Sequence, residues 1–125
     1  METANIKATS SEVVGKGVRR RPLVVGEKMM LYVYELEEGA SFPCHKHVHE
    51  EAKYVLSGKL ELRGPTGSQV IEAGTACVIH SNEPHAAYAP GPGPAIYLNI
   101  FSPIREAFLK KETRWTKPRR NIKPD

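Results

Sequence analysis

Residues 39–58 read GASFPCHKHVHEEAKYVLSG and contain His45, His47 and Glu51 within seven positions, followed by a turn glycine. Side chains two positions apart in a β-strand point to the same face, so His45 and His47 should lie together. Glu51 can join them if the short segment after His47 lets the chain bend. Two imidazoles and a carboxylate on one face are typical transition-metal ligands. We expect His85, which follows a second strand–turn–strand segment, to be the fourth ligand.

The spacing of these residues resembles the first signature motif of the cupin superfamily, which here reads Gly39-x5-His45-x-His47-x3-Glu51-x6-Gly58. The resemblance covers about residues 27–109. It implies a small antiparallel jelly-roll barrel that holds its metal inside, near one mouth. As the cofactor we expect one divalent transition metal (Mn, Fe, Ni or Zn), because mixed nitrogen and oxygen ligands suit all four.

Residues 72–91, EAGTACVIHSNEPHAAYAPG, resemble the second cupin motif, whose histidine is the fourth ligand and corresponds to His85. Cupins usually have proline and then glycine where this chain has His80 and Asn82. Asparagine adopts left-handed backbone conformations more readily than most residues, so Asn82 should still make the turn. We expect His80 to serve the loop and not to bind metal.

The length of 125 residues fits one domain with one core. There is no apolar run long enough to span a membrane, and the N-terminus lacks the apolar core of a secretory signal. A cytoplasmic protein with no membrane partner is therefore expected. Cys44 and Cys77 should be free thiols in that compartment, and strand alternation should point Cys44 away from the metal.

The net charge of +4 is concentrated near the ends of the chain, in residues 19–21 and 110–125. Such patches occur in nucleic-acid-binding proteins, but no binding motif accompanies them here. A solvated basic tail explains the second patch. Nucleic acid is therefore not an expected partner.

Short alternating runs separated by Gly, Pro or Asn recur along the chain and predict an all-β sandwich or barrel. We divide the chain into an N-terminal arm (1–16), a single jelly-roll cupin barrel, which is an antiparallel β-sandwich (17–109), and a basic C-terminal tail (110–125). Pro22 restricts its strand to a sheet edge or a bulge. Only residues 103–111 could form a helical turn or two. A small sandwich leaves edge strands unpaired, so we expect a homodimer in which residues near 17–25 pair across the interface.

Lys53 lies two positions after Glu51, so it should share the face of the metal ligands. A lysine that faces into a barrel is costly unless it meets an anion or reaches solvent. Two interpretations stay open. Lys53 either binds a substrate carboxylate or donates a proton, or the strand twists it to the rim, where it extends into solvent.

The stretch IYLNIFSPIREAFL, residues 96–109, resembles a segment of small cupins that open the ring of unsaturated uronates during pectin and alginate breakdown. That segment reads Asp-x-Phe-Ser-Pro-x-Arg-Glu, so Phe101 and Arg105 match it and Asn99 replaces its acid. Arg105 could hold a carboxylate with two hydrogen bonds. These cupins also commonly have Gln at the position of Glu51. An amide at position 99 cannot be a general base at neutral pH.

The leading interpretation is a metal-dependent lyase or isomerase acting on a small anionic, sugar-acid-like molecule. Lys53 and Arg105 would orient the anion, and proton transfer would fall to Tyr97, to His49 or to water on the metal. A non-haem iron dioxygenase is the first alternative, because three His and one Glu are a ligand set of cupin dioxygenases. A non-catalytic cupin that binds a small ligand is the second alternative.

Overall fold

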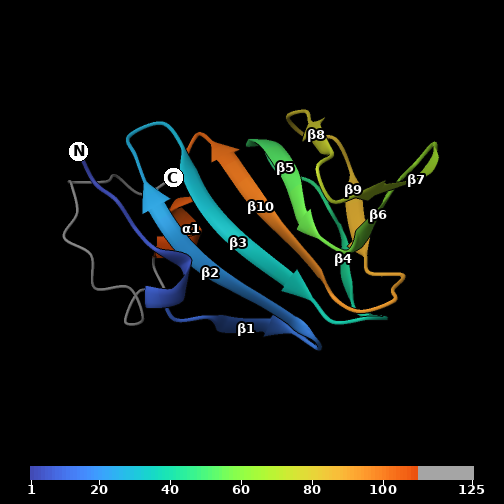
Figure 1. Cartoon of the computed structure of the whole chain (residues 1–125). Helices are drawn as coiled ribbons and strands as arrows, with labels where there is room; N and C mark the ends of the chain where they lie inside the picture. The colour runs from blue at the N-terminus through green and yellow to red at the C-terminus, as the bar shows by residue number, and fades with distance from the viewer. Residues whose placement is uncertain (110–125) are drawn as a thin grey trace.

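Two antiparallel sheets face each other in the computed structural model, which describes residues 1–109 (Figure 1). The larger sheet has the order β1-β2-β3-β10-β5-β8, and the smaller has the order β4-β9-β6-β7. The elements are η1 (Ile6–Ala8), β1 (Glu12–Gly15), β2 (Val18–Val25), β3 (Met30–Leu36), β4 (Ser41–His45), β5 (Glu50–Ser57), β6 (Lys59–Gly64), β7 (Gly67–Glu72), β8 (Ala76–Ile79), β9 (His85–Tyr88), β10 (Ala95–Ser102) and α1 (Glu106–Leu109). This is the predicted all-β jelly-roll sandwich.

Strand alternation sorts the side chains of β10 into two faces. Tyr97, Asn99 and Phe101 are all buried between the sheets, while the residues between them are only partly covered. The pairing of β10 with β5 sets Asn99 opposite Lys53 and Phe101 opposite Glu51. The middle of the larger sheet therefore brings polar groups from two strands to one place inside the sandwich.

Two turns carry the residues whose backbone freedom the fold needs. Gly58 joins β5 to β6 with φ of +78°, and a Cβ atom there would collide with the carbonyl oxygen of Pro94. Asn82 takes φ of +63°, which confirms that it makes the left-handed turn. Its backbone N–H donates to the His47 carbonyl at 2.7 Å, so this turn also fixes the loop that carries His47.

The first sixteen residues, expected as an arm, contain η1 and the strand β1. Strand β1 pairs with β2 in the register Glu12↔Arg20, so it extends the larger sheet. Pro22 lies beyond that pairing, at a register shift between Pro22 and Val24, which is the bulge that its ring predicts. Within the chain, β1 already occupies the edge of β2 up to Arg20, so the predicted pairing of residues 17–25 across a dimer stays a prediction.

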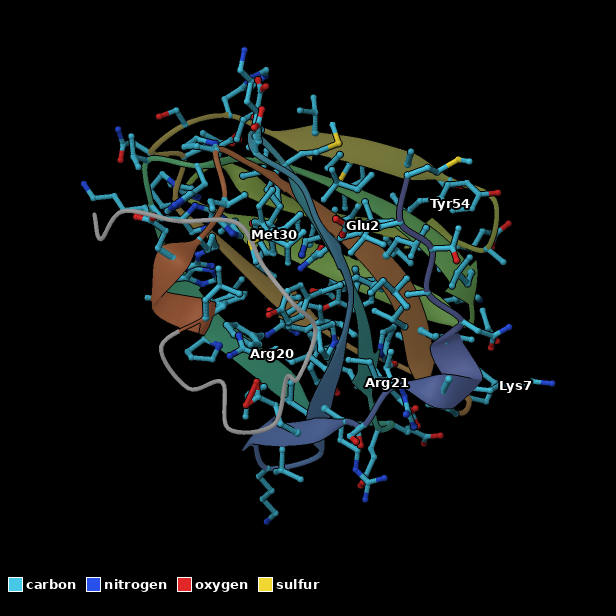
Figure 2. All side chains as sticks on the ribbon, turned by 90° about the vertical axis from the view of Figure 1, so that its left-hand side faces the viewer. Glu2, Lys7, Arg20, Arg21, Met30 and Tyr54 are labelled. Atoms are coloured by element: carbon cyan, nitrogen blue, oxygen red, sulfur yellow. The ribbon has the colours of Figure 1, made fainter. Side chains whose placement is uncertain are left out.

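The N-terminal segment crosses the outer face of the larger sheet, where Lys7 lies near Arg21 (Figure 2). Arg21 donates to the Thr9 carbonyl at 2.7 Å and so holds this segment against β2. Both cysteines are free, as predicted, and Cys44 is exposed. Among residues 1–109, no helix is long and apolar enough to cross a membrane. The predicted basic tail lies outside the described residues.

Candidate metal centre

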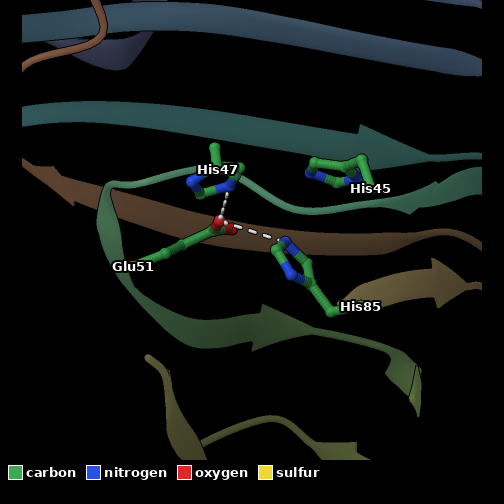
Figure 3. Close-up of side chains that lie close together, drawn as sticks. All are labelled: His45, His47, Glu51 and His85. Atoms are coloured by element: carbon green, nitrogen blue, oxygen red, sulfur yellow. Dashed lines mark hydrogen bonds and ion pairs between the residues drawn. The ribbon is translucent and has the colours of Figure 1, made fainter. Parts of the chain in front are cut away.

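The four residues expected to bind a metal come together between the two sheets (Figure 3). His45 and His85 are direct partners across the β4–β9 pair, His47 lies in the loop after β4, and Glu51 lies near the start of β5. One ligand atom from each side chain lies within 4.8 Å of all the others. The first motif and the second motif therefore meet at one point, and the cluster could bind a metal ion.

Backbone carbonyl groups orient the three imidazole rings. A carbonyl oxygen only accepts hydrogen bonds, so each Nδ1 must carry the hydrogen and donate it, which leaves Nε2 of a neutral ring with a free lone pair. The Nδ1 donors and their acceptors are His45 to Pro43 at 2.8 Å, His47 to His49 at 3.1 Å, and His85 to Glu83 at 2.7 Å. The tautomers are thus set for ligation through Nε2.

The Glu51 carboxylate is the centre of the cluster. Its Oε1 atom lies 3.1 Å from Nε2 of His47 and 3.4 Å from Nε2 of His85 (Figure 3). The His85 Nε2 atom is buried and makes no hydrogen bond. A buried polar atom without a partner is unusual, and lone pairs that face a carboxylate oxygen need a cation between them. Three nitrogens and one oxygen fit a divalent transition ion.

Lys53 supplies the positive charge that keeps Glu51 ionised. Burial alone would raise the pKa of the Glu51 carboxyl, but the Lys53 ammonium, together with the neighbouring His47 and His85 side chains, holds that pKa well below its usual range. The Lys53 Nζ atom lies 2.6 Å from Glu51 Oε2 and 2.9 Å from Asn99 Oδ1. Oε2 is therefore engaged by lysine, while Oε1 faces the histidines.

Of the two interpretations of Lys53, the one that takes it to the rim does not describe this structure. Its side chain is 4 % exposed and its ammonium lies 4.7 Å from the centroid of the Tyr97 ring. The acceptors of its hydrogen bonds, Glu51 and Asn99, are side chains of the protein itself. The sequence alone did not predict this pairing. A direct role in catalysis stays a prediction.

A narrow pocket opens beside the cluster, with a cavity volume of about 20 Å³ inside about 300 Å³ of space that includes solvent at its mouth. Tyr34 and Phe42 are wall residues that the sequence analysis did not single out, although Tyr34 has the inward parity of β3. The lining residues are Tyr34, Phe42, His45, Glu51, Lys53, His85, Ala87, Tyr97, Asn99, Phe101 and Arg105. The predicted Lys53, Tyr97 and Arg105 therefore all line one pocket with three of the four cluster residues.

Arg105 brings a second positive charge to this pocket, in a different setting. Its guanidinium lies over the rings of Phe101 (5.2 Å) and Phe108 (4.5 Å), and it forms no ion pair with any acid of residues 1–109. Burial lowers the pKa of Arg105, but a guanidinium stays charged at neutral pH. This charge is open to an anion in the pocket.

Tyr97 and the remaining histidines differ in their access to the pocket. Tyr97 is 1 % exposed and stacks on Tyr34, and burial raises the pKa of the Tyr97 hydroxyl well above its usual value. The hydroxyl is therefore protonated at neutral pH and is not an anionic base. His49 is buried but does not line the pocket. His80 is exposed and lies 3.8 Å from Glu50, outside the cluster, as expected for a loop residue.

The segment that carries all four cluster residues also decides the family. Residues 32–101 match the family model described as "Cupin domain". The chain is a cupin. The first and second motifs identified in the sequence both lie inside the matched segment, and the distant relationship to pectin-degradation cupins is also confirmed.

Among known proteins, this cupin is 28% identical over 102 residues to the pectin degradation protein KdgF of Dickeya dadantii, which covers 81% of this chain and 92% of that protein. Its fold is similar to the KdgF structure from Halomonas sp., with a TM-score of 0.81 and 23% identity over 87% of this chain and 99% of the other. An RmlC-like cupin from Shewanella frigidimarina gives a TM-score of 0.76 and 26% identity over 86% and 99%.

Proposed function

We propose that this cupin is a metal-dependent lyase or isomerase that acts on a small anionic, sugar-acid-like molecule. One observation carries the proposal. Residues of the candidate metal cluster line the pocket. Arg105 lines it too, and its guanidinium has no acid partner among residues 1–109. A cation site and an anion site facing one cavity suit a substrate with a carboxylate next to a reactive oxygen.

The metal would be held by His45, His47, Glu51 and His85, and a transition ion that takes more than four ligands would keep a position for substrate. When bound, a divalent ion supplies Lewis acidity that polarises a carbonyl or hydroxyl oxygen. The Nδ1 hydrogen bonds of the three histidines would hold the rings in place for this role.

Arg105 is the side chain best placed to bind the substrate carboxylate, through its planar pair of donors. Lys53, which we expected to share this role, is engaged by Glu51 and Asn99, and so it acts first on the charge of the cluster. Tyr97 lines the pocket in its protonated form and is our candidate proton donor. Phe42 and Phe101 would cover the faces of a sugar ring.

The reaction we propose is the opening of an unsaturated uronate to a linear keto acid. The bond between the anomeric carbon and the ring oxygen breaks, and a proton passes from the anomeric hydroxyl to the ring carbon of the former double bond. No atom is gained or lost, so no co-substrate is needed. Support comes from the 28% identical pectin degradation protein and from the Phe101-to-Glu106 segment.

The test is an assay with unsaturated galacturonate prepared by enzymatic cleavage of pectin. Protein stripped with a chelator is reloaded separately with Mn, Fe, Ni or Zn, and loss of the ultraviolet absorbance of the double bond is followed. Turnover by at least one metal form, absent in the stripped protein and in His85→Ala, supports the proposal. Tight binding without turnover by any form would instead make this a ligand-binding cupin.

A non-haem iron dioxygenase is the second candidate, favoured by the three His and one Glu of the cluster. The two functions differ in their need for oxygen. Oxygen uptake that depends on iron and on an added organic substrate would favour the dioxygenase. Turnover of the uronate by the Zn or Ni form without oxygen would exclude it as the explanation of that activity.

A further inference from the structure

A second arginine lies directly behind the pocket and is not explained by the function proposed above. Arg20 lies on β2 (Figure 2). It is only 5 % exposed, although it does not line the pocket. Its Nε atom donates to Glu12 on β1 at 2.9 Å, and its Nη1 atom lies 3.4 Å from the Tyr34 hydroxyl. Tyr34 lines the pocket, so Arg20 contacts a wall residue without lining the pocket itself.

Arg20 also shares an aromatic ring with Arg105. The Arg20 guanidinium lies 3.7 Å from the centroid of the Phe108 ring, and the Arg105 guanidinium lies 4.5 Å from the same centroid. Phe108 belongs to α1, and its ring meets the rings of Tyr32 and Phe101 edge to face. The ring is therefore fixed on several sides, and one short helix connects the buried Arg20 to the partly buried Arg105.

We propose that Arg20 is a positioning residue of the metal pocket, which acts through Phe108 to hold Arg105 in the orientation that receives an anion. Two guanidiniums repel each other unless something separates or neutralises them. Glu12 neutralises Arg20, and the Phe108 ring attracts both cations, so Arg105 keeps its charge but not its freedom.

This arrangement requires arginine at position 20. A planar guanidinium can stack on a ring while its edge donates to Glu12 and Tyr34, whereas an ammonium is a compact, strongly hydrated charge that cannot do both. Lysine at this position would keep the charge and lose the stack. The anion part of the inference rests on the proposed function, while the contact between Arg20, Phe108 and Arg105 does not.

The chain offers a matched control on its surface. Arg63 pairs with Glu61 at 2.7 Å and lies 4.4 Å from the centroid of the Tyr88 ring, and neither Arg63 nor Tyr88 lines the pocket. Arg20→Lys and Arg63→Lys thus remove the same kinds of contact in two places. Phe108→Leu is the second test variant, because it removes the shared ring of a half-buried residue and leaves both arginines in place.

The first readout needs no ligand. In ¹⁵N-labelled protein, the Nε–Hε signal of Arg105, assigned by its loss in Arg105→Lys, reports the ring environment of that guanidinium. We expect the signal to shift or broaden in Arg20→Lys and in Phe108→Leu and to stay in place in Arg63→Lys. A buried arginine with a purely structural role would lower stability without moving this signal.

The second readout uses the metal-loaded protein and D-galacturonate as the probe, with affinity measured by calorimetry. We expect Arg20→Lys to weaken binding about fivefold, and Arg63→Lys to leave it unchanged, because one buried cation–π contact is lost. In a Phe108→Leu background, Arg20→Lys should add little, since the path to Arg105 is already broken.

An Arg105 signal that stays in place in both Arg20→Lys and Phe108→Leu overturns the inference. So does additive weakening of galacturonate binding by Arg20→Lys and Phe108→Leu. If the signal moves as expected but galacturonate binds neither the wild type nor any variant, Arg20 still positions Arg105. The proposed sugar-acid function is then what fails.

Discussion

Two cations line the same pocket, and they differ in whether an acid among residues 1–109 neutralises them. Lys53 lies between Glu51 and Asn99, and its ammonium donates a hydrogen bond to each of these side chains. Arg105 lies against Phe101 and Phe108 and has no ion pair with an acid of residues 1–109. A neutralised charge stabilises its partner, whereas an unneutralised charge beside a cavity is available to a ligand.

The largest effect should follow from removing Lys53. In metal-free protein, Lys53→Met leaves the buried Glu51 carboxylate without its counter-charge, and the free energy of unfolding should fall by about 3 kcal/mol. Adding Zn²⁺ should restore more stability to this variant than to the wild type, because the ion replaces the missing charge. Urea unfolding with chelator or with Zn²⁺ measures both values.

Glu51→Gln provides the control for that experiment. In the double variant, Lys53→Met should cost clearly less than it does alone, because no buried carboxylate is left to neutralise. Equal costs in both backgrounds would mean that Lys53 stabilises the fold by packing and not by its charge. Lys53 would then not differ from Arg105 in neutralising a buried acid.

Removing Arg105 should act on the ligand and not on the cluster. Arg105→Met should weaken galacturonate binding by the metal-loaded protein about thirtyfold, because a partly desolvated charge is lost from the pocket. Metal content should stay the same, since Arg105 is not among the cluster residues. Calorimetry measures galacturonate affinity, and elemental analysis measures metal content. Unchanged affinity in this variant would mean that Lys53, and not Arg105, binds the anion.

A smaller effect should appear in the pH dependence of metal-free protein. Burial lowers the pKa of His45 from its ordinary 6.5, so the unfolded chain binds a proton at this side chain more readily than the folded chain. Stability should therefore fall as the pH drops below about 6.5. His45→Gln should flatten the curve between pH 7 and 5.5, measured by urea unfolding in chelator; an unchanged curve would contradict this origin.

The sequence predicted the fold and the cluster because both depend on local spacing. The intervals within residues 39–58 place His45, His47 and Glu51, and strand parity correctly placed Lys53 on the face of these ligands. The β1 strand was not predicted because four residues carry little periodic signal. The contact between Glu12 and Arg20 that accompanies its pairing is likewise not visible in the sequence.

The remaining features were beyond sequence reasoning because they join distant segments. Asn99 reaches Lys53 only through the register of β5 and β10, forty-six positions apart. Phe108 meets Arg20 only because α1, which follows β10, packs back against β2. No periodicity or motif encodes such contacts, since they depend on how strands are ordered in the sheet.

The central claim is that four side chains from two motifs form one metal site, and metal stoichiometry tests it most directly. Wild-type protein and His85→Ala are stripped, dialysed against the same dilute Zn²⁺ or Ni²⁺, and analysed for metal per chain. We expect one ion per wild-type chain and a loss of most of it in the variant. No bound ion in the wild type, or equal loading of both proteins, would contradict it.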